Sequence, residues 1–573
     1  MSRPLRSAGW TAGDDETALE HRVALRMGGA HVSASDSRPI IGIAHSASDL
    51  NPCNLPLAAL ADAAARGVTE AGGIPVIFPT ISLGEDLMKP SAMLYRNLLS
   101  IEVEETLRSN PIDGVVLLTN CDKSTPGALM GAISTDLPTI LAVGGNRPAP
   151  FFQGRRIGTG TDLWRMLDRR RAGEIDNATW NEFENCYACG TGSCNTLGTA
   201  STMALMAEAL GFSLPSAGTV QAGSTRSVQI AEASGRRAVE LVEWDLRPSR
   251  ILTPAALHNA AVVLQAVAGS TNAVLHLAAI AGRAGLSFGQ DMLQRIGSAV
   301  PVLTDVEPTG QYLMAELDEA GGLPTIVGVL GELIDPAVVT VTGGPLLGGA
   351  SAAWGVAVRP LHDPVFPGPA IRGVRGSLAP DGAVLKAATS SPQLWRHRGP
   401  ALVFSDYLQM RARLDDPDLE VDEGTVLVLR GCGPIGVPGM PEWGMVPIPQ
   451  RLAERGVTDM VRVTDARMSG TSYGTVFLHA APEAALGGPL ALVRDGDPIV
   501  VDVEDGRLDL DVEASELARR RAAWVPPVSE HLRGWPALYQ RHVMQAPSGC
   551  DLDFLVGDTA AKRRFVEPVI GRS

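Results

Sequence analysis

The sequence contains no apolar run long enough to cross a membrane. A transmembrane helix needs about 20 consecutive, mostly apolar residues. Polar residues interrupt the most apolar segment, residues 257–282, at His258, Asn259, Gln265, Ser270, Thr271 and Asn272. The first 30 residues also lack the apolar core of a secretory signal. We therefore expect a cytoplasmic protein with no membrane partner.

Positive charge is also scarce. The chain has 48 Lys and Arg residues against 63 Asp and Glu residues, which gives a net charge of −15 and a pI of about 5.2. Proteins that bind nucleic acids carry a basic surface, so we expect no nucleic-acid partner. An acidic protein that binds an acidic substrate needs a local source of positive charge, and a bound metal ion is the simplest one.

Two common nucleotide-binding motifs are missing as well. No G-x-G-x-x-G follows a predicted strand, and there is no G-x-x-x-x-G-K-[ST], so dinucleotide-binding and P-loop functions find no support. The 45% hydrophobic and 19% charged residues are typical of a folded enzyme rather than a disordered chain. With 573 residues, the chain is too long for one hydrophobic core, and we expect two or three domains.

Residues 38–365 alternate between strand-like and helix-like segments. Apolar runs predict strands at 39–46, 73–81, 113–120 and 138–145, and helical periodicity predicts helices at 55–72, 91–109, 127–135 and 193–211. Residues 257–282 predict two buried helices, the second of which Ser270 or Thr271 could cap. This rhythm predicts an α/β domain with a parallel sheet, in which ligands gather at the carboxyl ends of the strands.

The pattern changes at residues 362–376, which are rich in Pro and Gly and resemble a linker. Beyond this segment, short apolar runs predict strands at 400–406, 424–431 and 459–466, and residues 497–513 predict a hairpin with an Asp-Gly turn. We therefore predict three parts: an N-terminal extension (1–37), an α/β domain (38–365) and a β-barrel domain (366–573).

Seven cysteines are present, and in a cytoplasmic chain they are more often thiols or metal ligands than disulfides. Cys53 and Cys121 follow predicted strands, and Cys194 lies where a predicted helix begins. Three thiolates from such loops could meet at one sheet edge and hold a cluster with one iron left open as a Lewis acid. Cys186 and Cys189 precede Cys194 in a C-x2-C-x4-C pattern that suggests zinc or an iron–sulfur cluster. The alternative for each cysteine is a small buried hydrophobe.

Three carboxylates on constrained loops offer oxygen ligands for a hard cation. Asp122 follows one of the cysteines directly, Glu85 follows the predicted strand 73–81, and Glu442 lies in a loop rich in Gly and Pro. Such ligands suit Mg²⁺. Lys123 cannot bind a cation as an ammonium, but as a carbamate it would be an anionic ligand. Without other information, surface ion pairs explain these four residues more simply.

The segment MSGTSYG, residues 468–474, places glycines and hydroxyl groups in a tight turn after a predicted strand. Glycines let the backbone approach a ligand closely and expose N–H groups to an anion. A serine in such a turn can act as a base if a metal ion or a positive dipole lowers its pKa. His479 follows the turn, and we interpret it as a structural histidine.

Six segments together resemble one family, the dihydroxy-acid and sugar-acid dehydratases. They occur in the family's order: SDLNPCN (48–54), TNCDKSTPGALMGA (119–132), SCNTLGTASTM (193–203), AGSTNAVLHL (268–277), GPIGVPGMPE (433–442) and residues 465–497. The resemblance runs from about residue 38 to about residue 560. Within the last segment, MSGTSYGTV and APEAALGGPLALV are most similar to the aldonate branch of the family.

The resemblance implies a dehydratase that converts a sugar acid, such as the pentonate L-arabinonate, to its 2-keto-3-deoxy acid. It implies two metal groups: a [2Fe–2S] cluster on Cys53, Cys121 and Cys194, and Mg²⁺ on Glu85, Asp122, a carbamylated Lys123 and Glu442. It also implies that Ser469 removes the C2 proton, with Thr471 beside the substrate. Finally, it implies a barrel of the aconitase swivel type and a homodimer or homotetramer.

Three alternatives remain open. One is a branched-chain dihydroxy-acid dehydratase of the same family. The second is a redox protein whose cluster carries electrons on four cysteines, and the third is a sugar-acid-binding protein without catalysis. The family gives no role to Cys186 and Cys189, which could compete with Cys194 as cluster ligands.

Overall fold

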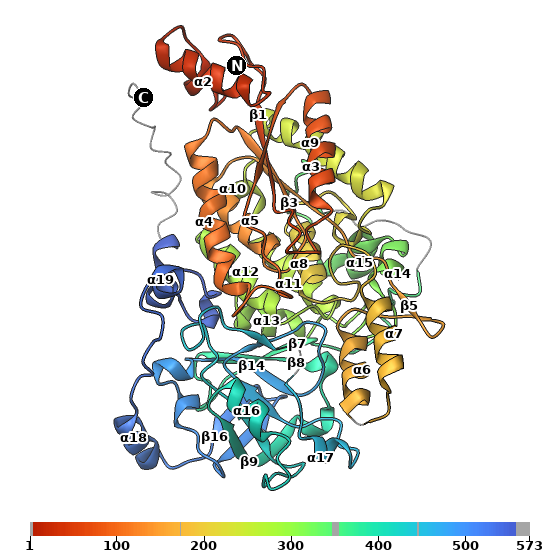
Figure 1. The fold of residues 1–573 in the computed structure, drawn as a ribbon, viewed down its shortest axis with the longest axis vertical. Helices are drawn as coiled ribbons and strands as arrows, with labels where there is room; N and C mark the ends of the chain where they lie inside the picture. Colours follow the sequence, from red (N-terminus) through yellow and green to blue (C-terminus); the bar gives the residue numbers. More distant parts are fainter. Residues whose placement is uncertain (1–3, 172, 347–354, 444–445, 557–573) are drawn as a thin grey trace.

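Two sheets organise the chain, and the computed structural model describes residues 4–171, 173–346, 355–443 and 446–556 (Figure 1). The first sheet has four parallel strands in the order β2-β1-β3-β4: β1 (Ile40–His45), β2 (Ile74–Pro79), β3 (Gly114–Thr119) and β4 (Thr139–Val143). Strands β3 and β4 are buried at every position, as expected for parallel strands covered by helices on both faces.

Helices cover this sheet and connect it to the second half of the chain (Figure 1). α3 (Leu57–Glu70) and α9 (Thr225–Glu243) pack on each other and on the strands, and α5 (Ser124–Thr135) packs on β3 and on α4 (Met93–Ser109). Three further helices are buried along almost their whole length: α8 (Thr199–Ala209), α11 (Pro254–Ala266) and α12 (Asn272–Arg283). They pack on one another, and α8 and α12 also pack on α5.

The second sheet has eight strands in the order β16-β15-β9-β10-β12-β14-β8-β7. The strands are β7 (Ile371–Val374), β8 (Gly382–Lys386), β9 (Arg396–Phe404), β10 (Val426–Leu429), β12 (Arg462–Thr464), β14 (Val476–Ala481), β15 (Pro498–Asp502) and β16 (Arg507–Leu510). Strands β9, β10, β12 and β14 are parallel, and the others pair antiparallel. A bridge between Arg375 and Arg507 joins the two edges, which makes the sheet barrel-like.

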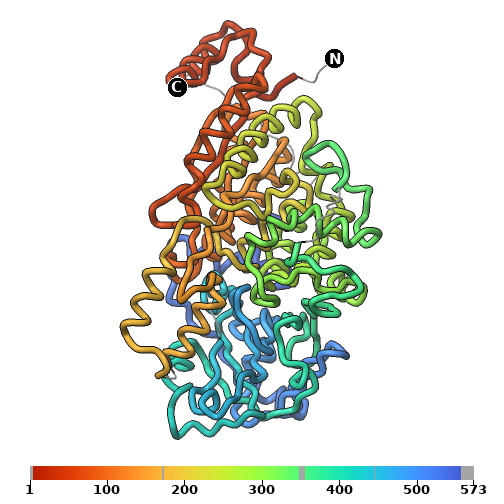
Figure 2. Tube along the Cα trace, turned by 90° about the vertical axis from the view of Figure 1, so that its right-hand side faces the viewer, coloured from red at the N-terminus to blue at the C-terminus, as the bar shows by residue number. Residues whose placement is uncertain are grey.

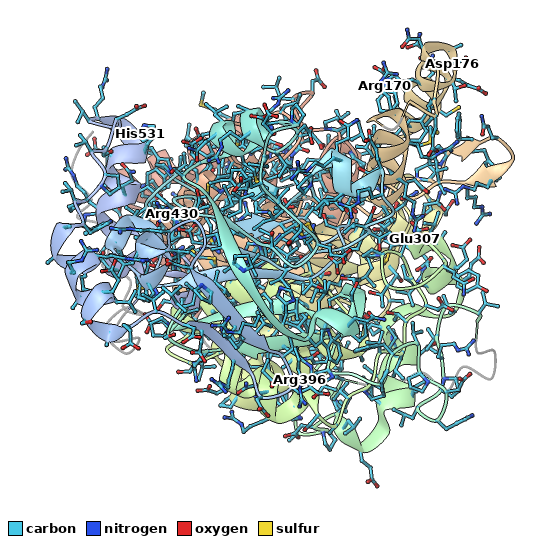
Figure 3. All side chains as sticks on the ribbon, turned by 90° about the horizontal axis from the view of Figure 1, so that it is seen from below. Arg170, Asp176, Glu307, Arg396, Arg430 and His531 are labelled. Carbon is cyan, nitrogen blue, oxygen red and sulfur yellow. The ribbon has the colours of Figure 1, made fainter. Side chains whose placement is uncertain are left out.

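Smaller elements frame the junction between the sheets. The short strands β11 (Glu442–Trp443) and β13 (Arg467–Met468) pair in parallel. α6 (Thr161–Arg171) and α7 (Asn177–Tyr187) form a projecting pair with Arg170 and Asp176 near its tip (Figure 3). α2 (Glu16–Met27) lies at the end of the molecule opposite the barrel-like sheet (Figure 2).

The remaining elements lie around these layers. They are α1 (Ala8–Thr11), β5 (Phe151–Phe152), β6 (Arg155–Arg156), α10 (Pro248–Ile251), α13 (Gln290–Gly297), α14 (Met314–Glu319), α15 (Gly322–Leu330), α16 (Tyr407–Arg413), α17 (Gln450–Ala453), α18 (Ala514–Ala523) and α19 (Gly534–His542). In the described part of the chain, no helix is both long and apolar enough to span a membrane.

The predicted fold class, a parallel α/β half followed by a barrel-like β half, is confirmed. The differences lie at element ends. The helix predicted at 127–135 begins earlier, at Ser124, and the helix predicted at 193–211 begins only at Thr199, because residues 193–198 form a loop. The hairpin predicted at 497–513 has a four-residue connection, 503–506, rather than a two-residue turn.

Candidate active site at the junction of the two sheets

Lys123 is fully buried where strand β3 leads into α5. Its ammonium forms an ion pair with the adjacent Asp122 carboxylate and lies 3.3 Å from Glu442 and 3.9 Å from Glu85. Glu442 comes from β11, so the cluster spans the junction of the two halves. The four residues predicted to hold magnesium therefore converge on one point. They are not surface ion pairs, because the lysine at their centre has no exposed area.

Arg467 completes this cluster, and sequence reasoning did not assign it a role. It is fully buried on β13, and its guanidinium lies 2.5 Å from Glu442 and 3.4 Å from Glu85. It also donates to the Met440 carbonyl at 2.7 Å. A signal was present in the sequence, because a lone arginine two residues before Ser469 interrupts a motif of small and hydroxyl residues.

Asn272, the first residue of α12, was also missed. Its Nδ2 donates to Glu442 Oε2 at 2.7 Å and to Thr199 Oγ1 at 3.0 Å. Its Oδ1 and the Oε2 of Glu85 are buried and have no hydrogen-bond partner among the described residues. A buried acceptor without a partner costs roughly 1–3 kcal/mol. A bound cation beside the cluster would give the Glu85 oxygen a partner.

The charges in the cluster do not balance. Three carboxylates face two cations, Lys123 and Arg467, so one net negative charge remains when all are ionised. Burial and Arg467 oppose the charge on Lys123, but the three carboxylates together raise its pKa above the ordinary lysine value. Burial, together with the neighbouring Asp122 and Glu442, raises the pKa of Glu85 although Lys123 and Arg467 act to lower it. This balance favours binding of one more cation.

The three cysteines predicted as cluster ligands lie together. A hydrogen bond with Cys53, followed by burial, raises the pKa of the Cys121 thiol. Burial raises the pKa of Cys194 to about 12, and the nearby Cys53 adds to this effect. Neither of the extra thiols is among the main causes of these pKa shifts: Cys186 is half-buried against a separate apolar cluster, and Cys189 is exposed.

The predicted catalytic hydroxyls form a pair in the turn that follows β13. Ser469 Oγ lies 2.9 Å from Thr471 Oγ1, and the Thr471 N–H donates to Ser469 Oγ at 3.3 Å. The Ser469 N–H donates to β11 at 2.7 Å, which ties the turn to the strand that carries Glu442. Only glycine fits at position 470, between Ser469 and Thr471, because a Cβ there would lie 2.7 Å from the side chain of Ser270.

Residues 470–474, GTSYG, also match the G-x-S-x-G spacing of hydrolase nucleophile turns. The serine of this match, Ser472, is buried, and the segment leads into strand β14 rather than into a helix. The turn therefore lacks the strand–turn–helix geometry of those enzymes. His479 lies on β14, where burial, followed by Arg467, lowers its pKa to about 3 and keeps the ring neutral. Neither ring nitrogen has a hydrogen-bond partner among the described residues, so the structure does not show the contacts expected of a structural histidine.

A second buried lysine lies beside the turn, and no sequence pattern pointed to it. Lys386, the last residue of β8, donates to the Gly470 carbonyl at 3.3 Å. Burial lowers its pKa to about 7, and no carboxylate of the described residues offsets that effect. Lys386 therefore differs from Lys123, whose positive charge is stabilised by three carboxylates.

The donor sets suit the two groups that the family resemblance implies, on one condition. Three convergent thiols match iron–sulfur chemistry, and three carboxylates match Mg²⁺. Lys123 fits only as a carbamate, because its ammonium otherwise stands between the carboxylates. Among the described residues, no three His, Cys, Asp or Glu side chains stand in a metal-coordinating arrangement, so neither the thiols nor the carboxylates have the spacing of a finished metal site in this structure.

Family models match both halves of the chain. The N-terminal part of the dihydroxy-acid/6-phosphogluconate dehydratases covers residues 38–347, and the C-terminal part covers residues 356–550. The chain belongs to this dehydratase family. It is therefore an enzyme, a hydro-lyase, and the family predicted from the six motifs is confirmed.

Three similar proteins cover this chain over almost its full length. L-arabinonate dehydratase of Rhizobium leguminosarum bv. trifolii is 44% identical over 97% of both chains. 6-deoxy-6-sulfo-D-gluconate dehydratase of Pseudomonas putida is 46% identical over 96% of both chains. Dihydroxy-acid dehydratase of Ignicoccus hospitalis is 37% identical over 93% of this chain and 98% of that one. The higher identities place this dehydratase in the aldonate branch.

Proposed function

We propose that this dehydratase converts a sugar acid of the pentonate class, such as L-arabinonate, to its 2-keto-3-deoxy acid. The observation that carries the proposal is the position of the Ser469–Thr471 hydroxyl pair on the β11–β13 ribbon, beside the carboxylate cluster around Lys123. The name of the L-arabinonate dehydratase relative supports the substrate class. We further propose that the protein acts as a homodimer or homotetramer.

Two groups would complete the site. Glu85, Asp122, Glu442 and a carbamylated Lys123 would hold Mg²⁺, and Cys53, Cys121 and Cys194 would hold a [2Fe–2S] cluster. When bound, Mg²⁺ would acidify the C2 proton of the substrate and the open iron would polarise the departing 3-hydroxyl.

The chain's own groups handle the proton. Ser469 Oγ, as an alkoxide, accepts the C2 proton, and that proton then leaves with the 3-hydroxyl as water, which restores the alkoxide. The Thr471 N–H, which donates to Ser469 Oγ at 3.3 Å, stabilises the negative charge on that oxygen. Trp164 Nε1 lies 3.3 Å from Thr471 Oγ1, where it orients the second hydroxyl. Arg467 holds Glu442 and Glu85 in place from the barrel-like side. A serine needs such surroundings because its hydroxyl is otherwise a very weak base.

The decisive experiment is an anaerobic screen of the purified, iron- and magnesium-loaded protein. C4–C6 aldonates, including L-arabinonate and 6-deoxy-6-sulfo-D-gluconate, are compared with 2,3-dihydroxy-3-methylbutanoate, and the 2-keto product is measured. We expect pentonates to give the highest kcat/KM. Turnover of the branched acid alone would identify the amino-acid branch. Reversible reduction without turnover would identify a redox protein, and ligand binding without turnover would identify a binding protein.

A further inference from the structure

Lys386 is a buried cation that the proposed chemistry does not use. It is the last residue of strand β8 and is 5% exposed, and its ammonium donates to the Gly470 carbonyl at 3.3 Å. The segment that follows β8 also runs along the catalytic turn, because the Gly474 N–H donates to the Thr389 carbonyl at 2.8 Å. A backbone hydrogen bond therefore holds the two segments together, and the lysine side chain is not the only anchor of the turn.

No negative group compensates the charge of Lys386. The ammonium has three N–H donors, but among the described residues it has one hydrogen-bond partner and no ion pair. Two other buried cations, Arg283 and Arg467, each pair with a carboxylate at 2.5 Å. A buried charge without a partner destabilises a fold. Its presence beside the catalytic turn therefore indicates a functional reason to keep it.

A single peptide group connects this ammonium to the proposed base. The Gly470 carbonyl accepts from Lys386 at 3.3 Å. The same peptide carries the Thr471 N–H, which donates to Ser469 Oγ, also at 3.3 Å. The C=O and N–H of one trans peptide are coplanar and point in opposite directions. A cation at the carbonyl end polarises the peptide and strengthens the hydrogen bond at its N–H end.

The charge of Lys386 also acts on Ser469 through space. Along this path the ammonium lies within about 9 Å of Ser469 Oγ. In a protein interior, a unit positive charge at that distance lowers the pKa of a hydroxyl by about one unit or more. The N-terminus of α8 faces the same turn, because a Cβ on Gly470 would lie 2.9 Å from the Thr199 nitrogen. Its partial positive charge has the same sign, so both effects favour an alkoxide.

The other ionisable groups on the elements around the turn are paired, stacked or neutral. They are Asp162, Arg165 and Asp168 on α6, His276 on α12, Arg372 on β7, Glu442 on β11, Arg462 on β12, Arg467 on β13, Tyr473 in the turn and His479 on β14. The arginines on α6, β12 and β13 form ion pairs at 3.2, 2.6 and 2.5 Å, and the one on β7 lies over Trp395. Burial lowers the pKa of both histidines and raises that of Tyr473, so these three are neutral near pH 7. Lys386 is therefore the uncompensated charge at this turn.

We propose that Lys386 is a positioning residue that acts through the Gly470–Thr471 peptide to hold Ser469 as an alkoxide. The inference rests on the proposed function, in which Ser469 takes the C2 proton of the substrate. The proton that first leaves Ser469 goes to solvent, and the alkoxide is restored each time water departs. Lys386 keeps its own protons throughout. The alkoxide is then the negative partner that this buried cation otherwise lacks.

Three replacements separate the charge of Lys386 from its hydrogen bond. Lys386→Arg keeps the charge, Lys386→Gln keeps a neutral N–H donor, and Lys386→Met keeps neither; Lys89→Met, at an exposed lysine, is the control. For each loaded protein, kcat, KM and the exchange of the substrate's C2 hydrogen with deuterium are measured against pH. We expect Lys386→Gln and Lys386→Met to move the rising limb of the profile up by about one pH unit or more. Near neutral pH, kcat should fall by roughly 10-fold or more with little change in KM, and Lys386→Arg should recover most of this loss.

The Lys386→Gln variant decides the test. A wild-type pH profile in this variant would overturn the inference, because a neutral hydrogen bond would then be sufficient. A higher KM with an unchanged rising limb would also overturn it, by assigning the lysine to substrate binding, and so would loss of bound iron or magnesium. If the larger guanidinium of Lys386→Arg prevents folding, which the Tm shows, the comparison of Lys386→Gln with the wild type still stands. A wild type that neither dehydrates any aldonate nor exchanges its C2 hydrogen would instead contradict the proposed function, and the inference with it.

Discussion

The Lys123 ammonium lies 3.3 Å from the Glu442 carboxylate, although 319 residues separate the two positions. Lys123 begins α5 beneath the parallel sheet, and Glu442 lies on β11 beside the barrel-like sheet. The charged cluster therefore exists only when the two halves of the chain are packed together. The distances within the cluster therefore depend on how the two halves are positioned relative to each other.

Replacement of Lys123 should abolish activity whatever the new residue. Lys123→Ala leaves three carboxylates facing Arg467 alone, and removal of one partner from a buried ion cluster costs about 3–5 kcal/mol of folding free energy. Lys123→Arg keeps the positive charge of the unmodified lysine and most of the stability of the metal-free protein, but a guanidinium cannot become a carbamate. We expect both variants to be inactive, and thermal unfolding should show Lys123→Arg to be the more stable. An active Lys123→Arg enzyme would rule out the carbamate.

Removal of divalent cations should stop turnover, and Mg²⁺ or Mn²⁺ should restore it. The cluster carries one negative charge in excess and a buried Glu85 oxygen without a hydrogen-bond partner, so a cation should also stabilise the fold. We expect Mg²⁺ to raise the Tm of the EDTA-treated wild type. Glu442→Gln should reduce that increase strongly, whereas Glu504→Gln, a change at an exposed position near β15, should leave it intact. An equal Mg²⁺ effect in both variants would place the ion elsewhere.

Iron binding should depend on three of the seven cysteines. Cys53→Ser, Cys121→Ser and Cys194→Ser should each lose most of the iron, because the three thiols lie together and a hydroxyl is a poor ligand for iron–sulfur clusters. Cys186→Ser and Cys189→Ser serve as controls and should keep it. Iron content and the visible absorption spectrum of anaerobically purified protein measure the effect. Full iron occupancy in Cys194→Ser would move the third ligand to one of the control positions.

The parts of the site that lie on regular elements could be predicted from the sequence. Strand β3 is an unbroken apolar run, so Cys121, Asp122 and Lys123 could be placed at the carboxyl end of a buried parallel strand. The residues alone did not predict burial of Lys123, since two of its three carboxylate neighbours, Glu85 and Glu442, come from distant parts of the chain. Only the family resemblance brought Glu85 and Glu442 to the same point.

The residues that sequence reasoning missed act through tertiary contacts. Arg467 and Asn272 reach Glu442 from β13 and α12, and nothing local in either segment specifies that meeting. Lys386 is informative because a buried cation normally has a charged partner, and no carboxylate of the described residues offsets the burial of this one, a property that exists only in the folded chain. Element ends were also unpredictable where loop contacts override helix propensity, as before Thr199.

Lys386 should make the fold less stable at neutral and lower pH. Its folded pKa of about 7 lies below the ordinary value of about 10.4. The unfolded chain therefore binds more protons between these values, and the free energy of unfolding should rise with pH across this window. Lys386→Met removes the charge and keeps a long apolar stem. We expect it to raise the Tm, by more near pH 6 than near pH 10.

The control for this prediction is Lys89→Met, a change at an exposed lysine. Its Tm should follow the wild type at every pH. If Lys386→Met shifts the Tm by the same amount at all pH values, the effect comes from packing, and the lysine does not titrate in the neutral range.

Ser469→Ala should keep the fold, the iron and the magnesium and lose nearly all turnover. The Ser469 hydroxyl contacts Thr471 Oγ1 at 2.9 Å but touches none of the predicted metal ligands, so its removal should leave both donor sets intact. Loss of a positioned base typically costs roughly 10²–10⁴-fold in rate. The variant should also stop exchanging the C2 hydrogen of the substrate with solvent deuterium, which NMR measures directly.

The control is Thr471→Ser, which keeps a hydroxyl beside Ser469 and should retain this exchange. If Ser469→Ala exchanges that hydrogen at the wild-type rate, the base is another group, and Lys386, held at the same turn through Gly470, becomes the first to test.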